Sequence, residues 1–236
     1  MPASRGYNGP ERVSAMSVLP SIALKIGAAG TRCYHFGLAG EEVTMLMLLA
    51  GLILFFAPHS VAVVAPSWRN RLVMHLRPRS WKGVYSLLSA AGLILIVYGF
   101  ARARGSPVVL YVSPAWLHAV TWVLMLPVFP LLFAAYLPGR IQAAAKHPML
   151  AAIKLWATAH LLANGTLADV LLFGSFLVWA VAVRISLKRR VPVPVRGVPA
   201  SRYNDLIALL LGLALYVAFI WRLHGLIIGI PLLAAQ

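Results

Sequence analysis

The sequence predicts an all-α fold, a polytopic membrane helix bundle with about six transmembrane helices. Two observations support this class. The chain is 61% hydrophobic with a mean hydropathy of +0.84, and from Met45 onward long apolar runs alternate with short segments that hold most of the Lys and Arg. A helix rises about 1.5 Å per residue, so about 20 apolar residues cross roughly 30 Å of hydrocarbon. The expected spans are residues 45–66, 84–101, 115–136, 148–163, 167–185 and 205–223.

The first part of the chain, residues 1–43, differs in composition from the remainder. It is richer in Gly, Ser and charge, and its apolar patch at 18–26 is too short to span a bilayer. We expect a flexible N-terminal extension, or an upstream stretch included by a mis-assigned start with Met45 or Met47 nearer the true beginning. An amphipathic anchor is the alternative. The transmembrane domain is then expected at 44–236.

The charge pattern predicts the orientation. The chain has 21 Lys and Arg against 5 Asp and Glu, a net charge of +16, which on a soluble face would suggest nucleic acid. Here the bases concentrate in three alternate loops, so the positive-inside tendency places those loops in the cytoplasm and both termini outside. We therefore expect lipid headgroups and no nucleic acid as partners. The last basic segment, 186–203, is rich in proline and is expected to be an extended cytoplasmic linker. Arg102 and Arg104 are exceptions on the opposite side. The loop bases are Arg69, Arg71, Arg77, Arg79, Lys82, Arg140, Lys146, Arg184, Lys188, Arg189, Arg190, Arg196 and Arg202.

Two local patterns refine the first half of the domain. Residues 67–76 mix bases with apolar residues at helical spacing, and Trp68 and Trp81 flank them, which is typical of a short helix in the headgroup plane. Pro127 and Pro130 in the third span each remove an intrahelical hydrogen bond. We therefore expect a bend in that span.

The fourth and fifth spans are predicted to form a tight hairpin with its turn on the outer side. Pro148 suits the first turn of a helix, where its missing N–H has no helical partner. Asn164 and Gly165 tolerate the left-handed conformation that ends many helices. Thr166 followed by Asp169 indicates a capping box at the start of the next helix.

The polar residues of the hydrophobic body exclude several kinds of functional site. Asp169 and Asp205 are its only carboxylates, so paired-carboxylate catalysis is poorly supported. The single cysteine, Cys33, lies outside the hydrophobic body and cannot form an intramolecular disulfide. No nucleotide-binding loop, GxSxG, HExxH or CxxCH motif is present. Histidine within the bilayer is costly unless partnered, so the intramembrane histidines become the functional hypothesis.

His59 and His160 both lie within predicted spans. His59 lies in Ala-Pro-His-Ser toward the inner part of the first span, and His160 lies near the end of the fourth. A neutral imidazole at either position could ligate a metal or a haem iron. The alternative is a histidine that only bonds a backbone carbonyl across helices.

The other histidines lie at helix boundaries. His147 directly precedes the fourth span and is either a cap or a ligand. It is 13 positions before His160, which sets the two about 140° apart on a straight helix, so both cannot point at one iron. Lys154 follows His147 by two turns on nearly the same face, where it snorkels toward the cytoplasm or meets an anionic group such as a propionate. His118 and His224 sit near span ends, where an interfacial role is favoured.

An ordered series of motifs resembles the NnrU family. These motifs are Phe-Phe-Ala-Pro-His-Ser at 55–60, Trp-Lys-Gly-Val-Tyr-Ser-Leu at 81–87, Lys-His-Pro-Met-Leu at 146–150, the segment 154–165, and the basic end of the fifth span at 184–190. NnrU proteins are bacterial integral membrane proteins associated with nitrite and nitric oxide reduction in denitrification. The resemblance implies a multi-pass protein of the bacterial inner (plasma) membrane, denitrification proteins as partners, and a haem-bearing redox or nitric oxide-responsive accessory role.

The same family is similar to 15-cis-zeta-carotene isomerase, a haem b enzyme. This similarity implies His59 and His160 as axial haem ligands, with His147 and Trp156 in matching motifs. It also suggests an alternative function, haem-dependent cis/trans isomerisation of a polyene, although Ala157 stands where the isomerase has Cys. On the predicted topology His59 and His160 differ in depth by on the order of 10 Å, so His59 with His147 stays open as the ligand pair. A cofactor-free scaffold or small-solute transporter is a third possibility.

Overall fold

The computed structural model describes residues 43–189 and 198–233 of the 236-residue chain. The chain divides into two units, residues 1–43 and 44–236, and the described helices lie in the second, apart from Val43 at the start of the first helix. The predicted extension, apart from Val43, and most of the predicted linker lie outside the described residues. Within them, regular structure is helical apart from one isolated β-bridge between Val109 and Thr166. The predicted all-α class is confirmed.

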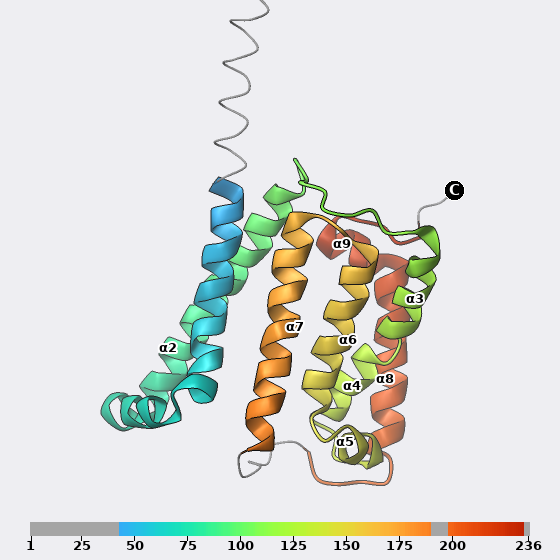
Figure 1. The fold of residues 1–236 in the computed structure, drawn as a ribbon. Helices are drawn as coiled ribbons and strands as arrows, with labels where there is room; N and C mark the ends of the chain where they lie inside the picture. Colours follow the sequence, from blue (N-terminus) through green and yellow to red (C-terminus); the bar gives the residue numbers. More distant parts are fainter. Residues whose placement is uncertain (1–42, 190–197, 234–236) are drawn as a thin grey trace, which may run out of the picture. The chain divides into compact units, whose positions relative to one another are not determined.

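All six predicted segments are helical, and Figure 1 shows how they are arranged. Five helical stretches are long and apolar enough to cross a membrane: Val43–Val64, Arg79–Ala103, Ala115–Ala134, Leu167–Lys188 and Asn204–Ile228. The sixth, α6, has 16 residues and extends only about 24 Å. The elements after the first helix Val43–Val64 are α2 Pro66–Ala103, α3 Ala115–Met125, α4 Val128–Ala134, α5 Arg140–Ala145, α6 Pro148–Ala163, α7 Leu167–Lys188, α8 Asn204–Ala218, the π-helix η1 Phe219–Leu223 and α9 His224–Ile228.

Both predicted irregularities are present. The backbone of α2 breaks at Arg77, whose φ of 62° is not helical and which precedes a proline, so a short helix starting at Pro66 is separated from the long one. The third span is divided at Leu126 and Pro127 into α3 and α4. The prolines therefore bend this span as expected, because each lacks the N–H that a straight helix needs.

Glycines bring the first helix and α2 into backbone contact. A Cβ atom on Gly51 would lie 2.7 Å from the Ile96 nitrogen, and one on Gly92 would lie 2.6 Å from the Phe55 nitrogen. Gly99 meets the backbone of the first helix in the same way. Small residues allow such close approach between helices in a membrane, where packing replaces the hydrophobic effect as the driving force.

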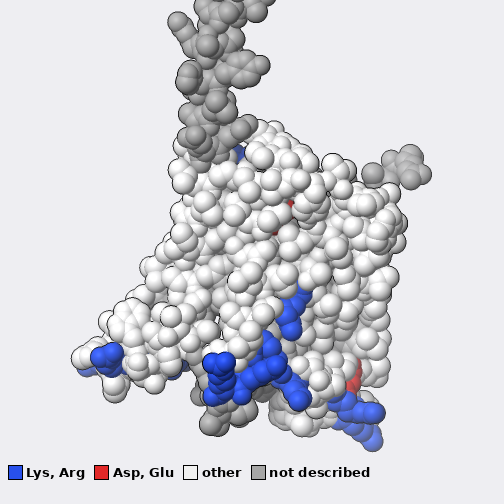
Figure 2. Space-filling model, in the orientation of Figure 1, with Lys and Arg blue, Asp and Glu red and all other residues white. Residues whose placement is uncertain are grey.

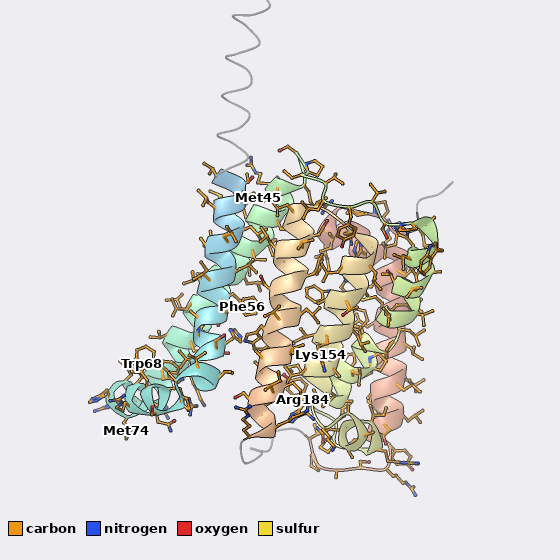
Figure 3. All side chains as sticks on the ribbon, in the orientation of Figure 1. Met45, Phe56, Trp68, Met74, Lys154 and Arg184 are labelled. Atoms are coloured by element: carbon orange, nitrogen blue, oxygen red, sulfur yellow. The ribbon has the colours of Figure 1, made fainter. Side chains whose placement is uncertain are left out.

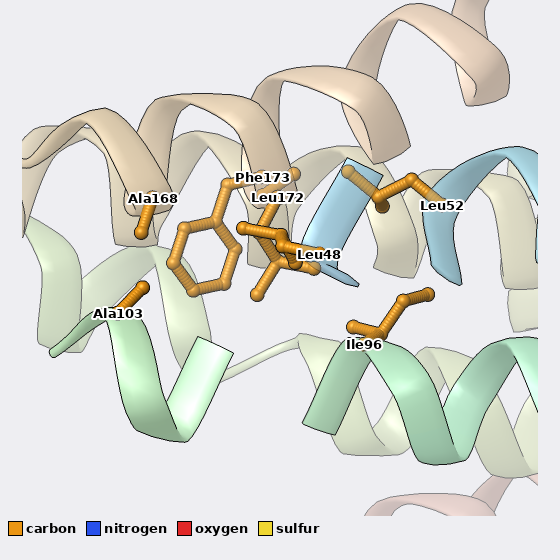
Figure 4. Packing of buried hydrophobic residues seen from close by; sticks show 8 residues of the cluster. Leu48, Leu52, Ile96, Ala103, Ala168, Leu172 and Phe173 are labelled. Atoms are coloured by element: carbon orange, nitrogen blue, oxygen red, sulfur yellow. The ribbon is translucent and has the colours of Figure 1, made fainter. Parts of the chain in front are cut away.

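A buried apolar cluster joins this helix pair to α6 and α7 (Figure 4). Its members come from all four helices, so it fixes their relative positions at the end of the bundle where α7 begins. The cluster consists of Leu48, Leu52, Ile96, Ala103, Ala157, Ala168, Leu172 and Phe173.

The caps of the α6–α7 hairpin follow the prediction. Pro148 occupies the first turn of α6. At the start of α7, Thr166 and Asp169 form the capping box, each side chain accepting a hydrogen bond from the backbone N–H of the other. Asp169 is thereby a buried structural carboxylate.

The turn of this hairpin is built differently from the prediction. Asn164 is extended, with φ −127° and ψ 129°, and Gly165 does not have a positive φ, so no left-handed cap ends α6. Instead the loop before α3 crosses the turn. The backbone nitrogens of Leu110 and Tyr111 donate to the Gly165 carbonyl at 2.8 and 3.1 Å. A Cβ on Gly165 would lie 1.9 Å from the Tyr111 carbonyl oxygen, so close approach explains the glycine.

The surface divides into an apolar body and a basic end. Large apolar side chains stay exposed along the spans, for example Leu87 at 71% and Val178 at 70%. Such exposure is expected where lipid is the solvent. Figure 2 shows Lys and Arg gathered at the end of the bundle that holds α5 and the last turn of α7. The described residues therefore fit a multi-pass membrane protein.

Candidate histidine site

His59 lies in the first helix, half-buried among aromatic rings from three helices. Its ring stacks on Phe55 with centroids 4.3 Å apart, and it lies 5.0 Å from the Tyr85 ring of α2 and 6.0 Å from the Trp179 ring of α7. Its Nδ1 is 2.7 Å from the Phe55 carbonyl oxygen, one helical turn earlier. We call these residues the His59 cage.

His160 in α6 has the same local bond. Its Nδ1 is 2.8 Å from the Trp156 carbonyl oxygen, and its ring stacks on Phe173 of α7 with centroids 4.5 Å apart. Thr121 of α3 donates to the Ala159 carbonyl at 3.1 Å next to it. His160 is therefore held between α6 and α7, close to the end of the bundle where the hairpin turns.

The two carbonyl contacts set the tautomer of both rings. A carbonyl oxygen only accepts hydrogen bonds, so Nδ1 must carry the proton and donate in each neutral imidazole. Nε2 is then the nitrogen with a free lone pair. Metal-bound histidines in proteins commonly show this arrangement, in which a backbone carbonyl orients the ring and the second nitrogen ligates. The donor chemistry of His59 and of His160 therefore fits a haem iron.

The rings between the two histidines form one continuous path. From the His59 cage, Phe55 lies 5.6 Å from Phe176 of α7, Phe176 lies 5.4 Å from Trp156 of α6, and Trp156 lies 5.3 Å from His160. Phe56, labelled in Figure 3, also packs on Phe176 at 4.9 Å. Aromatic side chains thus occupy the space between the two histidines, which make no direct ring contact with each other.

The spacing of the histidines does not fit one shared iron in this packing. His160 rests on Phe173, whereas His59 meets Trp179, which follows six positions later in α7. Six residues correspond to about 9 Å along a helix. The difference in depth expected from the sequence is thus present. Each imidazole could serve as an axial ligand by itself, but the two lie too far apart in depth to bind the same iron.

One polar atom of the His59 cage has no partner. The Trp179 Nε1 is buried and makes no hydrogen bond within the described residues. A buried donor without an acceptor costs about 1–3 kcal/mol. An acceptor on a bound group would satisfy this N–H. The observation distinguishes the surroundings of His59 from those of His160.

The remaining predicted residues lie outside this cage. His147 is the N-cap residue of α6 at the basic end, and among the described residues its side chain makes no capping hydrogen bond. Burial, and then the charge of Arg184, lower the pKa of His147. Lys154 is half-buried on α6 and makes no hydrogen bond or ion pair within the described residues. His118 and His224 each bond a nearby carbonyl, of Ala115 and Ile230 respectively.

Sequence reasoning missed the aromatic residues that surround the histidines. Phe173, Phe176 and Trp179 recur every three positions and line one side of α7. This spacing in the sequence could have predicted an aromatic face on the helix. Tyr85 was quoted within a motif, but its contact with His59 depends on how the first helix and α2 pack.

The fold and these residues define a polytopic helical membrane protein with two carbonyl-anchored histidines among aromatic rings. The NnrU protein family matches residues 47–232, so the chain belongs to the NnrU family, as its motifs indicated. Comparisons with curated proteins and with solved structures found no match.

Proposed function

We propose that this protein is a haem b-binding accessory of nitrite and nitric oxide reduction in the bacterial inner membrane. One observation carries the haem assignment: His59 presents a free Nε2 inside a cage of aromatic rings from three helices. Membership of the NnrU family supports the setting in denitrification. His59 is the first candidate axial ligand, and His160 is the second.

The chain's own residues would act as follows. The Phe55 carbonyl orients the His59 ring so that Nε2 would be the ligand, and the Trp179 N–H, which has no partner among the described residues, would donate to an acceptor of the bound group. His59 is half-buried among the surrounding rings. A haem held by His59 would supply an iron able to bind a small ligand such as nitric oxide. The separation of His59 from His160 favours this arrangement over a bis-histidine haem.

The absorption spectrum of the purified protein tests haem binding. After expression with added haem, we expect a Soret band and a five-coordinate, high-spin spectrum that shifts when nitric oxide is added. A six-coordinate low-spin spectrum would show instead that both imidazoles bind one iron. A colourless protein after haem-supplemented expression would refute the haem assignment and favour a cofactor-free scaffold.

The role in denitrification has a separate test. Deletion of the gene in its host should slow anaerobic growth on nitrite, and the wild-type gene should restore that growth while His59→Ala should not. Equal growth of the deletion strain would refute the role, whatever the spectrum shows.

Polyene isomerisation is the weaker alternative. Ala157 takes the position of the cysteine of the isomerase, and it is 0% exposed in the apolar cluster between the helices. A methyl group packed in this way has no reactive atom to offer a substrate.

A further inference from the structure

Two cations lie on adjacent helices within the apolar body. Lys154 in α6 and Arg184 in α7 are both half-buried, and neither forms a hydrogen bond or an ion pair within the described residues. The two described aspartates, Asp169 and Asp205, bind other groups. Asp169 caps α7, and Asp205 accepts hydrogen bonds from backbone nitrogens at the start of α5. No described acidic side chain therefore neutralises this cation pair.

The pair lies along the α6–α7 seam, above the basic end. Counted from the hairpin turn, Lys154 lies nine residues, about 14 Å, before the end of α6, and Arg184 lies 17 residues, about 26 Å, after the start of α7. Helical side chains lean toward the N-terminus of their own helix, so these two long side chains lean toward each other across the depth difference of about 12 Å. Figure 3 labels both in the half of the α6–α7 hairpin nearer the basic end, and Figure 2 shows basic side chains that extend from the basic end onto the apolar body. Arg184 is also close enough to His147 at the start of α6 for the two charges to interact.

Cations at this depth need an anion. Charged side chains within the hydrocarbon are costly and are normally paired or directed to an interface. The pair is flanked on α7 by exposed apolar side chains, Val178 at 70%, Val181 at 41% and Ile185 at 50%. A ligand that fits both features has a negative headgroup attached to apolar chains.

We propose that the α6–α7 seam binds one anionic phospholipid, with Lys154 and Arg184 holding its phosphate and the exposed aliphatic face of α7 contacting its acyl chains. A guanidinium presents two parallel donors to phosphate oxygens, and an ammonium adds a point charge. A small hydrated anion would match the charges but would gain nothing from the aliphatic face. The site does not depend on haem.

Lipid-dependent thermal stability of the full-length protein in neutral detergent tests this site. Phosphatidylglycerol should raise the unfolding temperature saturably, whereas phosphatidylcholine or inorganic phosphate should not. The double substitution Lys154→Met with Arg184→Gln should raise the phosphatidylglycerol concentration for half the effect at least tenfold. Lys154→Arg should keep the wild-type response, because it retains the charge.

A matched control removes the same charge outside the seam. Lys188→Met with Arg189→Gln changes two exposed cations at the end of α7 and should leave the lipid response unchanged. An equal response in the seam and control variants would overturn the proposal, as would stabilisation by inorganic phosphate alone. If the double seam variant does not fold, the single variants Lys154→Met and Arg184→Gln decide: each should weaken the response, and wild-type responses in both would refute the site.

Discussion

The surroundings of His59 and His160 differ although the two residues share the same local bond. Around His160, side chains and loop backbone are tied by hydrogen bonds: Thr121 bonds the next carbonyl, and Tyr111 donates to the carbonyls of Leu161 and Asn164. Around His59, the contacts are between rings, and the buried Trp179 N–H has no hydrogen-bond partner in the described part of the chain. A satisfied network indicates a structural role, whereas an unsatisfied donor beside a free imidazole nitrogen indicates a ligand site. His59 is therefore the first residue that we propose as a haem ligand.

The largest expected effect lies at the turn beside His160. Gly165→Ala would place a Cβ 1.9 Å from the Tyr111 carbonyl, so the loop must move away from the hairpin. We expect a loss of about 3 kcal/mol, a lowering of the unfolding temperature by several degrees. Gly174→Ala in α7 is the control, because its Cβ meets nothing within 4 Å. Thermal unfolding of both variants checks this, and equal melting temperatures would show that the loop does not hold the turn.

Gly92→Ala is the corresponding substitution near His59, and it acts through helix packing. Gly92→Ala would place a Cβ 2.6 Å from the Phe55 nitrogen and push the first helix away from α2. We expect a loss of about 2 kcal/mol and reduced haem content, because Phe55 orients His59. Gly83→Ala in α2 has open space around its Cβ and should keep haem and stability. The measurement is the haem content per protein. Full haem occupancy in Gly92→Ala would show that the position of His59 does not determine haem binding.

Tyr111→Phe should have a smaller effect, confined to the His160 side. Its hydroxyl donates to two carbonyls at the end of α6, and their loss should cost about 1 kcal/mol without changing haem content. Tyr136→Phe, at a position 50% exposed, is the control. A loss of haem in Tyr111→Phe would mean that the His160 end belongs to the binding site.

Trp179→Phe should have the smallest effect on stability. The substitution should not destabilise the haem-free protein, but it should weaken haem binding. Without haem the substitution removes an unsatisfied buried donor, so the protein should keep its stability or gain up to about 1 kcal/mol. With haem, affinity should fall several-fold. Haem titration of this variant beside Trp122→Phe, which is 38% exposed, measures the difference. Unchanged affinity would show that the Trp179 N–H does not face the ligand.

The features that the sequence predicted correctly are set by nearby residues. The bend at Pro127 and the capping box at Thr166 and Asp169 follow from one proline and one pair of side chains. The features that it missed depend on distant segments. The sequence alone predicts Gly165 as a helix-ending residue, because its close approach to Tyr111 depends on a segment more than 50 residues away. The Trp179 N–H, which lacks a partner in the described residues, likewise depends on how the first helix packs on α7. The assignment of His59 and His160 as haem ligands stays a prediction, and the sequence analysis did not identify the rings that separate them.

The most direct test compares the haem spectra of His59→Ala and His160→Ala, both expressed with added haem. We expect that His59→Ala is purified without haem, whereas His160→Ala keeps haem with a five-coordinate spectrum like that of the wild type and loses about 1–2 kcal/mol of stability. His147→Ala tests the other pairing and should leave the spectrum unchanged. Full haem occupancy with an unaltered spectrum in His59→Ala, or loss of haem only in His160→Ala, would contradict the assignment.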